Sequence, residues 1–120
     1  MPDRLFDVAN MLRTMNLNDR SELDQPVMRS VINRAYYAAF LVARDYCQES
    51  GIDCGHSTSH DRIVRALEAQ RKWRKQGRQL GQIKQLRHES DYDWNQTITD
   101  SDMRKAVRTS NEILQAFGKR

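Results

Sequence analysis

The sequence has few glycines and prolines, five and two in 120 residues, and it lacks the alternating Val, Ile and Thr pattern that β-strands require. No apolar run approaches the roughly 20 residues that a transmembrane helix needs. The N-terminus has neither the basic start nor the apolar middle of a signal peptide. These features predict an all-helical protein, with one domain over residues 1–120, located in the cytoplasm and without membrane contact.

Several common kinds of site are missing as well. There is no glycine-rich phosphate loop, no Ser/His/Asp order typical of a hydrolase and no EF-hand spacing. Cys47, Cys54, His56 and His60 are residue types that bind zinc, but their spacing fits none of the usual close Cys-x2–4-Cys pairs. Cysteines of a cytosolic protein stay reduced by default, and a buried Cys47 with histidines in a loop is the simpler interpretation. We therefore expect neither a metal nor a cofactor.

The least polar stretch of the chain predicts a central helix from Pro26 to Ser50. Nine consecutive residues between Arg34 and Arg44 carry no charge, in a chain in which 30% of the residues are charged. A helix that is apolar nearly all round is usually covered by neighbours on several sides. Proline is tolerated in a first helical turn, and Gly51 can supply the left-handed residue that ends the helix.

Three aromatic side chains, Tyr36, Tyr37 and Phe40, lie close together in the middle of this central helix. Aromatic density can indicate base stacking in proteins that bind single-stranded nucleic acids. In an Ala-rich helix it more often indicates a hydrophobic core, which is the interpretation we favour. Arg34 borders the apolar run and is expected to pair with an acid, for which Asp91 is the candidate.

Helical spacing of apolar residues predicts further helices on both sides of the central one. We expect a first helix over about Asp3–Met15, a third from a cap at Ser57, Thr58 or Ser59 to about Trp73, a mobile link or helix break at Arg74–Gly81, a fourth that contains Leu80, Ile83, Leu86 and Arg87, and a last one between Thr99 and Gly118. The last helix has the clearest start, because Thr99 and Asp102 have the spacing of a capping box. The predicted fold is a four- to five-helix up-and-down bundle.

The net charge of +4 is modest, but positive charge concentrates between Arg62 and His88. Such a cluster suits a polyanion such as RNA or DNA, although a solvated helix face explains it equally well. The expected RNA contacts, which we call the basic segment, are Arg71, Lys72, Arg74, Lys75, Arg78 and Lys84.

The stretch Leu86-Arg-His-Glu-Ser-Asp-Tyr-Asp-Trp94 is the main candidate for chemistry. Arg87 and Asp91 are oppositely charged and one helical turn apart, so they can form an ion pair. An arginine at the end of a core-facing row needs a buried partner or an anionic ligand such as an RNA phosphate. Histidine side chains titrate near neutral pH, so His88 could move protons. From spacing alone, a salt-bridged helix end and a catalytic site both remain open.

The stretch Arg-Ala-Tyr-Tyr-Ala-Ala-Phe that begins at Arg34, followed by Leu-Arg-x3-Asp-Tyr-Asp from Leu86 and by an Ile-Thr-capped last helix, resembles the HEPN superfamily. The resemblance covers residues 29–117 and is nearest to small stand-alone bacterial and archaeal members. It implies a four- to five-helix up-and-down bundle. Many members are metal-independent endoribonucleases of toxin–antitoxin, CRISPR and phage-defence systems, and they act as homodimers.

The family motif consists of Arg, a polar residue, three variable residues and His. The resemblance implies that Arg87 holds the scissile phosphate, that His88 is the polar residue, and that Tyr92 stands where the general acid/base histidine is expected. Asp91 and Arg34 would orient these groups. A tyrosine, with an ordinary pKa of about 10, is a poor base at neutral pH. Either His88 takes over, or Tyr92 donates a proton, or Tyr92 merely packs in a member that has lost catalysis.

We therefore expect an RNA-binding HEPN-like homodimer that acts as a toxin or defence endoribonuclease without a metal. In some family toxins a partner nucleotidyltransferase silences the protein by adenylylating a tyrosine near the motif, so Tyr92 is a candidate acceptor and such an antitoxin a candidate partner. The alternative is a non-catalytic helical adaptor or a nucleotide-binding regulatory subunit.

Overall fold

The computed structural model describes residues 2–52 and 59–120. Regular structure in these residues is helical throughout, without a strand. The elements in chain order are α1 (Arg4–Arg13), η1 (Ser21–Leu23), α2 (Asp24–Glu49), α3 (His60–Ala69), η2 (Arg71–Trp73), α4 (Arg74–Tyr92) and α5 (Asp100–Ala116). The prediction of an all-helical bundle is confirmed. None of the described helices combines the length and the apolarity that crossing a membrane requires.

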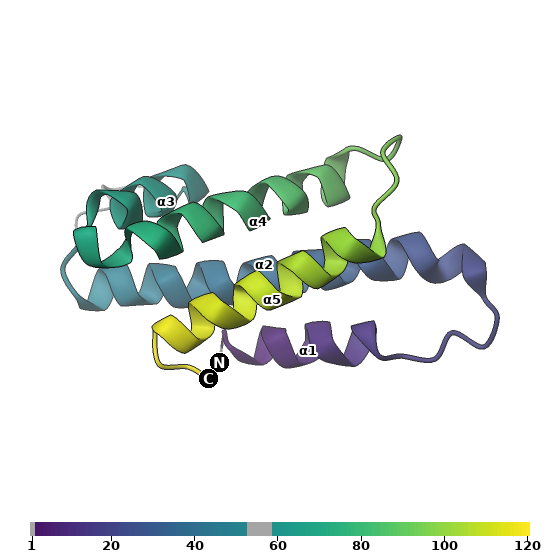
Figure 1. Ribbon diagram of the computed structural model, residues 1–120. Coiled ribbons are helices and arrows are strands. Elements are labelled where there is room, and N and C mark those ends of the chain that lie inside the picture. Colours follow the sequence, from purple (N-terminus) through teal and green to yellow (C-terminus); the bar gives the residue numbers. More distant parts are fainter. Residues whose placement is uncertain (1, 53–58) are drawn as a thin grey trace.

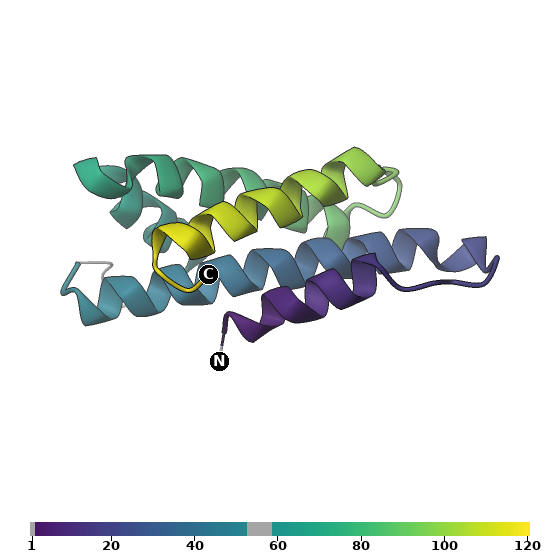
Figure 2. The same ribbon diagram turned by 60° about the horizontal axis from the view of Figure 1, so that its bottom comes forward.

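Helix α2 runs through the middle of the molecule and contacts each of the other four α-helices. Helices α1, α2, α4 and α5 alternate in direction, which makes the bundle up-and-down, and the short α3 lies beside the first half of α4 (Figure 1). Helix α1 and helix α4 lie on different sides of α2 (Figure 2). The elongated shape, 49 × 29 × 21 Å, follows from the length of α2 and the antiparallel neighbours along it.

The predicted central helix is confirmed, because α2 buries side chains on several of its sides. Its fully or almost fully buried apolar residues are Val31, Ile32, Ala35, Tyr36, Ala38, Ala39, Phe40, Val42, Ala43 and Cys47. Pro26 lies in the first turn, and Gly51 follows the end of the helix with a φ of 70°. This left-handed conformation favours glycine, and it lets the amide of Ile52 donate to the carbonyl of Cys47 at 3.0 Å.

The start of α5 also follows the prediction. The Thr99 hydroxyl accepts a hydrogen bond from the Asp102 amide at 3.1 Å, and the Asp102 carboxylate accepts one from the Thr99 amide at 3.0 Å. Helix α1 is shorter than expected, because it ends at Arg13. Met15, the last residue of the predicted helix, lies beyond the end of α1 and is exposed.

The predicted break within Arg74–Gly81 is wrong, since α4 is continuous from Arg74. The break lies before it, at residues 70–73, where Trp73 anchors the turn. The Trp73 ring centroid lies 4.9 Å from that of Tyr46 and 4.6 Å from that of Phe117. Its indole N–H donates to the Tyr46 hydroxyl at 3.2 Å. The chain thus reverses where an aromatic cluster joins the ends of α2 and α5.

Gly77, which lies within the predicted break, permits close packing of two helices. It is buried inside α4, and a Cβ atom at this position would lie 2.7 Å from the backbone nitrogen of Glu68 in α3. That distance is well inside van der Waals contact, so only a residue without a side chain allows α3 and α4 to approach this closely.

Candidate functional site

One face of α2 changes from polar to aromatic along the helix, and this face meets α4. Residues spaced three or four apart share a helix face, which aligns Arg29, Asn33, Tyr36 and Phe40. Tyr36 and Phe40 are buried, which confirms the core interpretation for these two aromatic residues. Tyr37, next to Tyr36, is half-buried.

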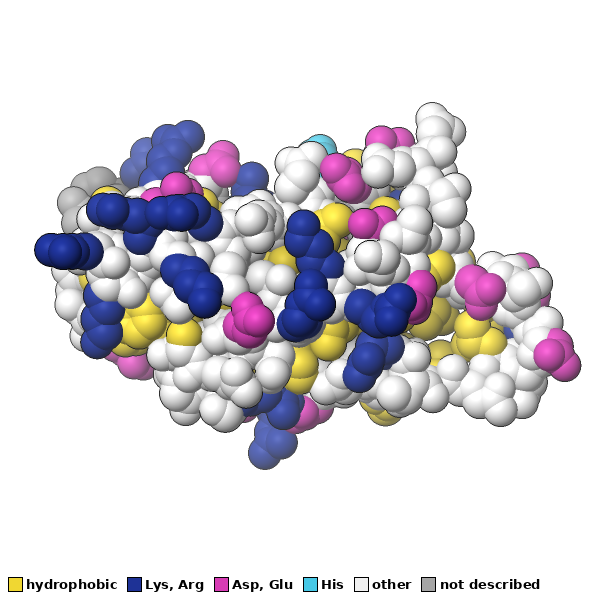
Figure 3. Space-filling model, viewed as in Figure 1, with side chains coloured by type: hydrophobic (Ala, Val, Ile, Leu, Met, Phe, Trp, Pro, Cys, Tyr) yellow, Lys and Arg dark blue, Asp and Glu magenta, His cyan; other side chains and the backbone are white. Residues whose placement is uncertain are grey.

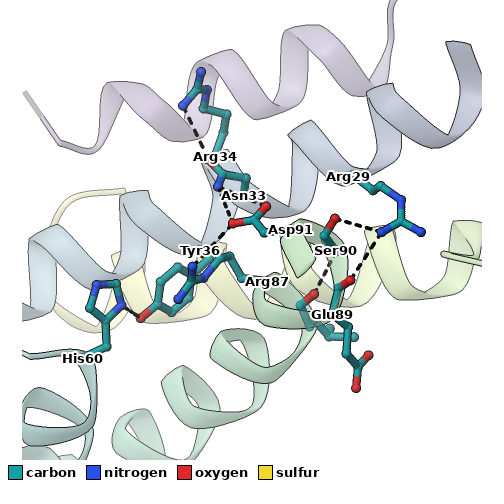
Figure 4. Close-up of polar contacts among 10 residues, drawn as sticks. Arg29, Asn33, Arg34, Tyr36, His60, Arg87, Glu89, Ser90 and Asp91 are labelled. Atoms are coloured by element: carbon teal, nitrogen blue, oxygen red, sulfur yellow. Dashed lines mark hydrogen bonds and ion pairs between the residues drawn. The ribbon is translucent and has the colours of Figure 1, made fainter. Parts of the chain in front are cut away.

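The opposing row of α4 changes character in the same direction. Leu80 and Ile83 are fully buried, and the next two turns place Arg87 and Asp91 on that side. Because α2 and α4 are antiparallel, the polar part of each row meets the polar part of the other (Figure 4). The structure therefore gathers the charged groups between the first half of α2 and the end of α4.

Arg87 lies among three tyrosine rings. The central carbon of its guanidinium is 5.3 Å from the ring centroid of Tyr36, 5.7 Å from that of Tyr37 and 5.9 Å from that of Tyr92. These distances are within the range of cation–π attraction. The side chain is 12% exposed and forms the expected ion pair with Asp91, at 3.4 Å. The arginine is thus held in place between the two helices.

Asp91 is held from α2 by Asn33, whose side-chain amide donates to the carboxylate at 3.1 Å. The expected contact between Arg34 and Asp91 is wrong. Arg34 is exposed and donates to the Asn33 side-chain oxygen at 3.4 Å. The reason is geometric: successive helix positions are about 100° apart, and position 33 is the one that faces α4. The orienting roles of Asp91 and Arg34 stay predictions.

His88 and Tyr92 are both exposed and stand one helical turn apart, with ring centroids 4.9 Å from each other. Tyr92 is 66% exposed and is the one of the pair whose ring reaches the Arg87 guanidinium. The three residues of the expected motif are thus near one another at the end of α4. The arginine lies between helices, while the histidine lies on the solvent side.

A family model for the HEPN domain matches residues 18–120, most of the chain and all of the α2–α4 face described above. The chain belongs to the HEPN family. No curated protein matches it, and no solved structure does. The expected family resemblance is therefore confirmed, while the roles of individual residues depend on the geometry of this HEPN protein itself.

Arg29 is a site residue that the sequence interpretation missed. It is only 5% exposed, and its guanidinium donates to backbone carbonyls at the end of α4 and in the loop that follows. These acceptors are Ser90 at 2.8 Å, Asp93 at 3.2 Å, Glu89 at 3.3 Å, and Gln96. A cation at a helix C-terminus satisfies the unpaired carbonyls and the negative end of the helix dipole.

The location of Arg29 was visible in the spacing of the sequence, because positions 29, 33, 36 and 40 share one helix face. A charged residue on a face that is otherwise turned to the core requires buried partners. Trp94 covers the guanidinium, with its ring centroid 4.6 Å away. Arg29 thereby fixes the end of α4, which carries Arg87 and Tyr92.

His60 is the second residue that the sequence interpretation missed, since it was assigned to a loop. It is the first residue of α3, and its Nδ1 atom is hydrogen-bonded to the Tyr36 hydroxyl (Figure 4). Its imidazole stacks on Phe40, with ring centroids 4.0 Å apart and planes 9° apart. Of the other residues weighed for zinc, Cys54 and His56 lie outside the described residues, and Cys47 is buried in α2.

Burial lowers the pKa of His60, and the positive charges of Arg87 and Lys84 lower that pKa further. Burial raises the pKa of Tyr36 well above its ordinary value. At neutral pH the pair therefore consists of a neutral imidazole and a protonated phenol.

The basic segment occupies a different part of the HEPN domain from Arg87. Five of its residues are exposed where η2 leads into α4, and dark blue side chains gather at that end of the molecule (Figure 3). Arg74 precedes Arg87 by thirteen residues, which corresponds to about 20 Å along a helix. Lys84 lies nearer to Arg87 but is paired with Asp61 at 2.8 Å. The six residues do not form one cluster with the motif, and their contact with RNA stays a prediction.

An open hollow of about 490 Å³ lies between the first half of α2 and the end of α4, and Asp91, the ion-pair partner of Arg87, lines it. The residues that line it include Arg29, Ser30, Asn33, Arg34, Asp91 and Trp94. The side chain of Trp94 is 67% exposed. The hollow thus combines an exposed cation, amide and carboxylate groups, and an accessible aromatic ring.

Proposed function

We propose that this HEPN protein binds single-stranded RNA along the α2–α4 face and cleaves it without a metal ion, with Arg87 as the residue that holds the scissile phosphate. The observation that carries the proposal is the position of Arg87 between tyrosine rings, paired with Asp91, which lines an open hollow. Arginine keeps its charge at any physiological pH, and its planar guanidinium suits two parallel hydrogen bonds to a phosphate.

The contact between Arg87 and Asp91 leaves the guanidinium free to bind a phosphate. At 3.4 Å the contact is longer than the roughly 2.7–2.9 Å of a strong charge-assisted hydrogen bond. Asn33 holds the other side of this carboxylate. Asp91 therefore orients the arginine through Nη1 and leaves the second terminal nitrogen for a ligand, while the Nε atom is buried.

The neighbouring hollow supports single-stranded RNA as the ligand. An exposed aromatic ring can stack on any base, and such stacking is worth about 1–3 kcal/mol per base. Trp94 offers such a ring, and Arg34 offers an exposed cation at the rim of the same hollow. The exposed residues of the basic segment would meet a more distant part of the strand, along the phosphate backbone.

The biological setting we propose is that of a toxin or defence endoribonuclease. Two copies would pair and bring two Arg87 side chains to one RNA strand. A nucleotidyltransferase antitoxin could silence such a protein by modifying Tyr92. In support of this partner, the Tyr92 side chain is largely exposed and lies within cation–π distance of Arg87, so a nucleotide attached there would obstruct the arginine.

The alternative function is that of a non-catalytic adaptor or nucleotide-binding regulatory subunit. One observation favours it: Arg87 is mostly buried, and its contacts with Tyr36 and Tyr37 hold α4 against α2. With Tyr92 in place of the motif histidine, the same arrangement could serve packing alone.

Cleavage of a generic single-stranded RNA in the presence of EDTA distinguishes the two functions. We expect the wild type to cut it and Arg87→Ala to be slower by about 100-fold or more, the range seen when one preorganised charge-stabilising donor is removed. Arg87→Lys should fall in between, because it keeps the charge and loses the planar fork. Arg104→Ala, an exposed arginine on α5, is the matched control and should cut at the wild-type rate. Absence of cleavage by the wild type across pH 6–9 would favour the adaptor.

A further inference from the structure

We propose that His60 is the proton-transfer residue of this site, that its Nε2 atom takes the proton of the attacking RNA 2′-hydroxyl, and that Tyr36 holds its ring in position. The inference rests on the proposed function. Position 92 carries a tyrosine where the family motif has a histidine, and His60 of α3 would take the role of that histidine.

The imidazole of His60 is fixed by three aromatic rings of α2. It stacks on Phe40 at 4.0 Å, meets the edge of Tyr37 at a centroid distance of 5.6 Å, and is hydrogen-bonded through Nδ1 to the Tyr36 hydroxyl. These contacts determine where the ring lies and which nitrogen is occupied. Because the side chain is half-buried, its other nitrogen can still face a ligand.

His60 and Arg87 share the same two tyrosines. The Arg87 guanidinium carbon lies 5.3 Å and 5.7 Å from the ring centroids of Tyr36 and Tyr37. The His60 ring lies 5.5 Å and 5.6 Å from the same two centroids. Figure 4 shows the Tyr36 side chain between the two groups, with the imidazole at its hydroxyl end, so a phosphate held by the arginine would have the imidazole across the same tyrosine.

The charged groups around His60 keep it in the form that a base requires. Arg87 and Lys84 of α4 face it, while Asp61 of α3 partly offsets them and is itself bound to Lys84 at 2.8 Å. Burial and the two cations hold the pKa of His60 below its ordinary value, so the ring is neutral at pH 7. The contact with the Tyr36 hydroxyl allows the tautomer that a base needs: when Nδ1 carries the proton and donates it to the Tyr36 oxygen, His60 keeps a lone pair on Nε2.

His88 is the competing candidate, and its surroundings are less suited. It is exposed, its ring contact is with Tyr92, and within the described residues no hydrogen bond orients its ring. A general base works best when a second group holds its ring and selects its tautomer. The Tyr36 hydroxyl holds the ring of His60 in this way and is compatible with the required tautomer.

The proposed step balances without a metal or a co-reactant. A bond forms between the RNA 2′-oxygen and the phosphorus, and the bond between phosphorus and the 5′-oxygen breaks. The 2′-hydroxyl proton moves to His60 Nε2, the leaving 5′-oxygen takes a proton from solvent water, and His60 returns its proton to solvent. The products carry a 2′,3′-cyclic phosphate and a 5′-hydroxyl.

The test compares His60→Asn with His88→Asn in the RNA cleavage assay. Asparagine can keep a hydrogen bond to Tyr36 while removing the basic Nε2. We expect His60→Asn to lose about 100- to 10,000-fold in kcat, the usual contribution of a general base, and to bind a 2′-O-methylated RNA within about threefold of the wild type. The wild-type rate should fall as the pH drops through a pKa below about 6.5, and this acid limb should vanish in His60→Asn.

Chemical rescue separates proton transfer from a structural role. Added imidazole should restore part of the activity of His60→Ala and none of that of Arg87→Ala. If His60→Asn cleaves within about threefold of the wild type, or if imidazole restores nothing to a folded His60→Ala, the role of His60 is refuted while Arg87-dependent cleavage stands. If the wild type does not cleave RNA at all, the proposed function fails and the role of His60 fails with it.

Discussion

Replacement of Arg29 by alanine should destabilise the protein strongly, although this residue lies outside the family motif. The substitution removes one guanidinium that serves four backbone carbonyls at the end of α4 and beyond it. It also uncovers the face of Trp94, which lies 4.6 Å from the guanidinium. The end of α4 would lose the contact that fixes it to α2.

The expected loss can be worked out from these contacts. Hydrogen bonds to charged groups contribute about 1.5–3 kcal/mol each, so four would contribute about 6–12 kcal/mol if all were lost outright. Arg29 lines the open hollow, and water there can replace part of the donors. Its Nε atom is buried without a partner, a defect that costs the wild type about 1–3 kcal/mol. The net loss should be about 3 kcal/mol, or about 10 °C in Tm for a chain of this length.

Thermal and urea unfolding, followed by circular dichroism, measure this loss directly. Arg104→Ala is the control, because Arg104 forms an exposed ion pair with Asp100, and such pairs are worth about 0.2–1 kcal/mol. A Tm for Arg29→Ala within about 2 °C of that control would show that Arg29 does not anchor α4. RNA cleavage by Arg29→Ala should fall even below its unfolding temperature, because Arg87 and Tyr92 lie on the segment that it releases.

Two further predictions concern packing and charge. Gly77→Ala should lower the free energy of unfolding in urea by about 1–3 kcal/mol, as overpacking does, because the new Cβ would lie 2.7 Å from the Glu68 backbone nitrogen. The control is Gly81→Ala, whose Cβ would lie at an ordinary 3.5 Å from Val64. It should change the free energy of unfolding by less than about 1 kcal/mol. Equal effects of the two substitutions would contradict the close approach of α3 and α4. RNA affinity should fall steeply with salt, and neutralising the exposed residues of the basic segment should flatten that dependence; an unchanged slope would exclude this segment from the RNA contact surface.

The sequence predicted those parts of the fold that depend on local signals. The apolar periodicity of α2 and the paired Thr99–Asp102 signal act within a few residues, so helix type and helix start could be inferred without a structure. The position of the break between α3 and α4 could not be inferred in this way. In the sequence alone, a glycine such as Gly77 suggests a helix break, because its close contact with the Glu68 backbone appears only in the folded protein. The turn at Trp73 likewise depends on aromatic partners from α2 and α5, which are distant in sequence.

In the candidate site, the contact within one helix was predicted, and the contacts between helices were not. Arg87 and Asp91 are one turn apart on one helix, so their ion pair followed from spacing. Asn33 and His60 reach the site from two other helices, and Arg29 reaches the end of α4 across some 60 positions of sequence. Such contacts depend on how each helix is rotated about its axis. Arg34 was expected to contact Asp91, but its neighbour Asn33 faces α4 and makes that contact.

The most direct test of the central claim uses an RNA strand that is 2′-O-methylated everywhere except at one ribonucleotide, incubated with the protein in EDTA. The wild type should cut after this ribonucleotide alone and leave a 2′,3′-cyclic phosphate, whereas Arg87→Ala should bind the strand and leave it intact. Cutting at methylated positions, equal cutting by Arg87→Ala, or no cutting by the wild type would contradict the claim that the α2–α4 face is a metal-independent ribonuclease site.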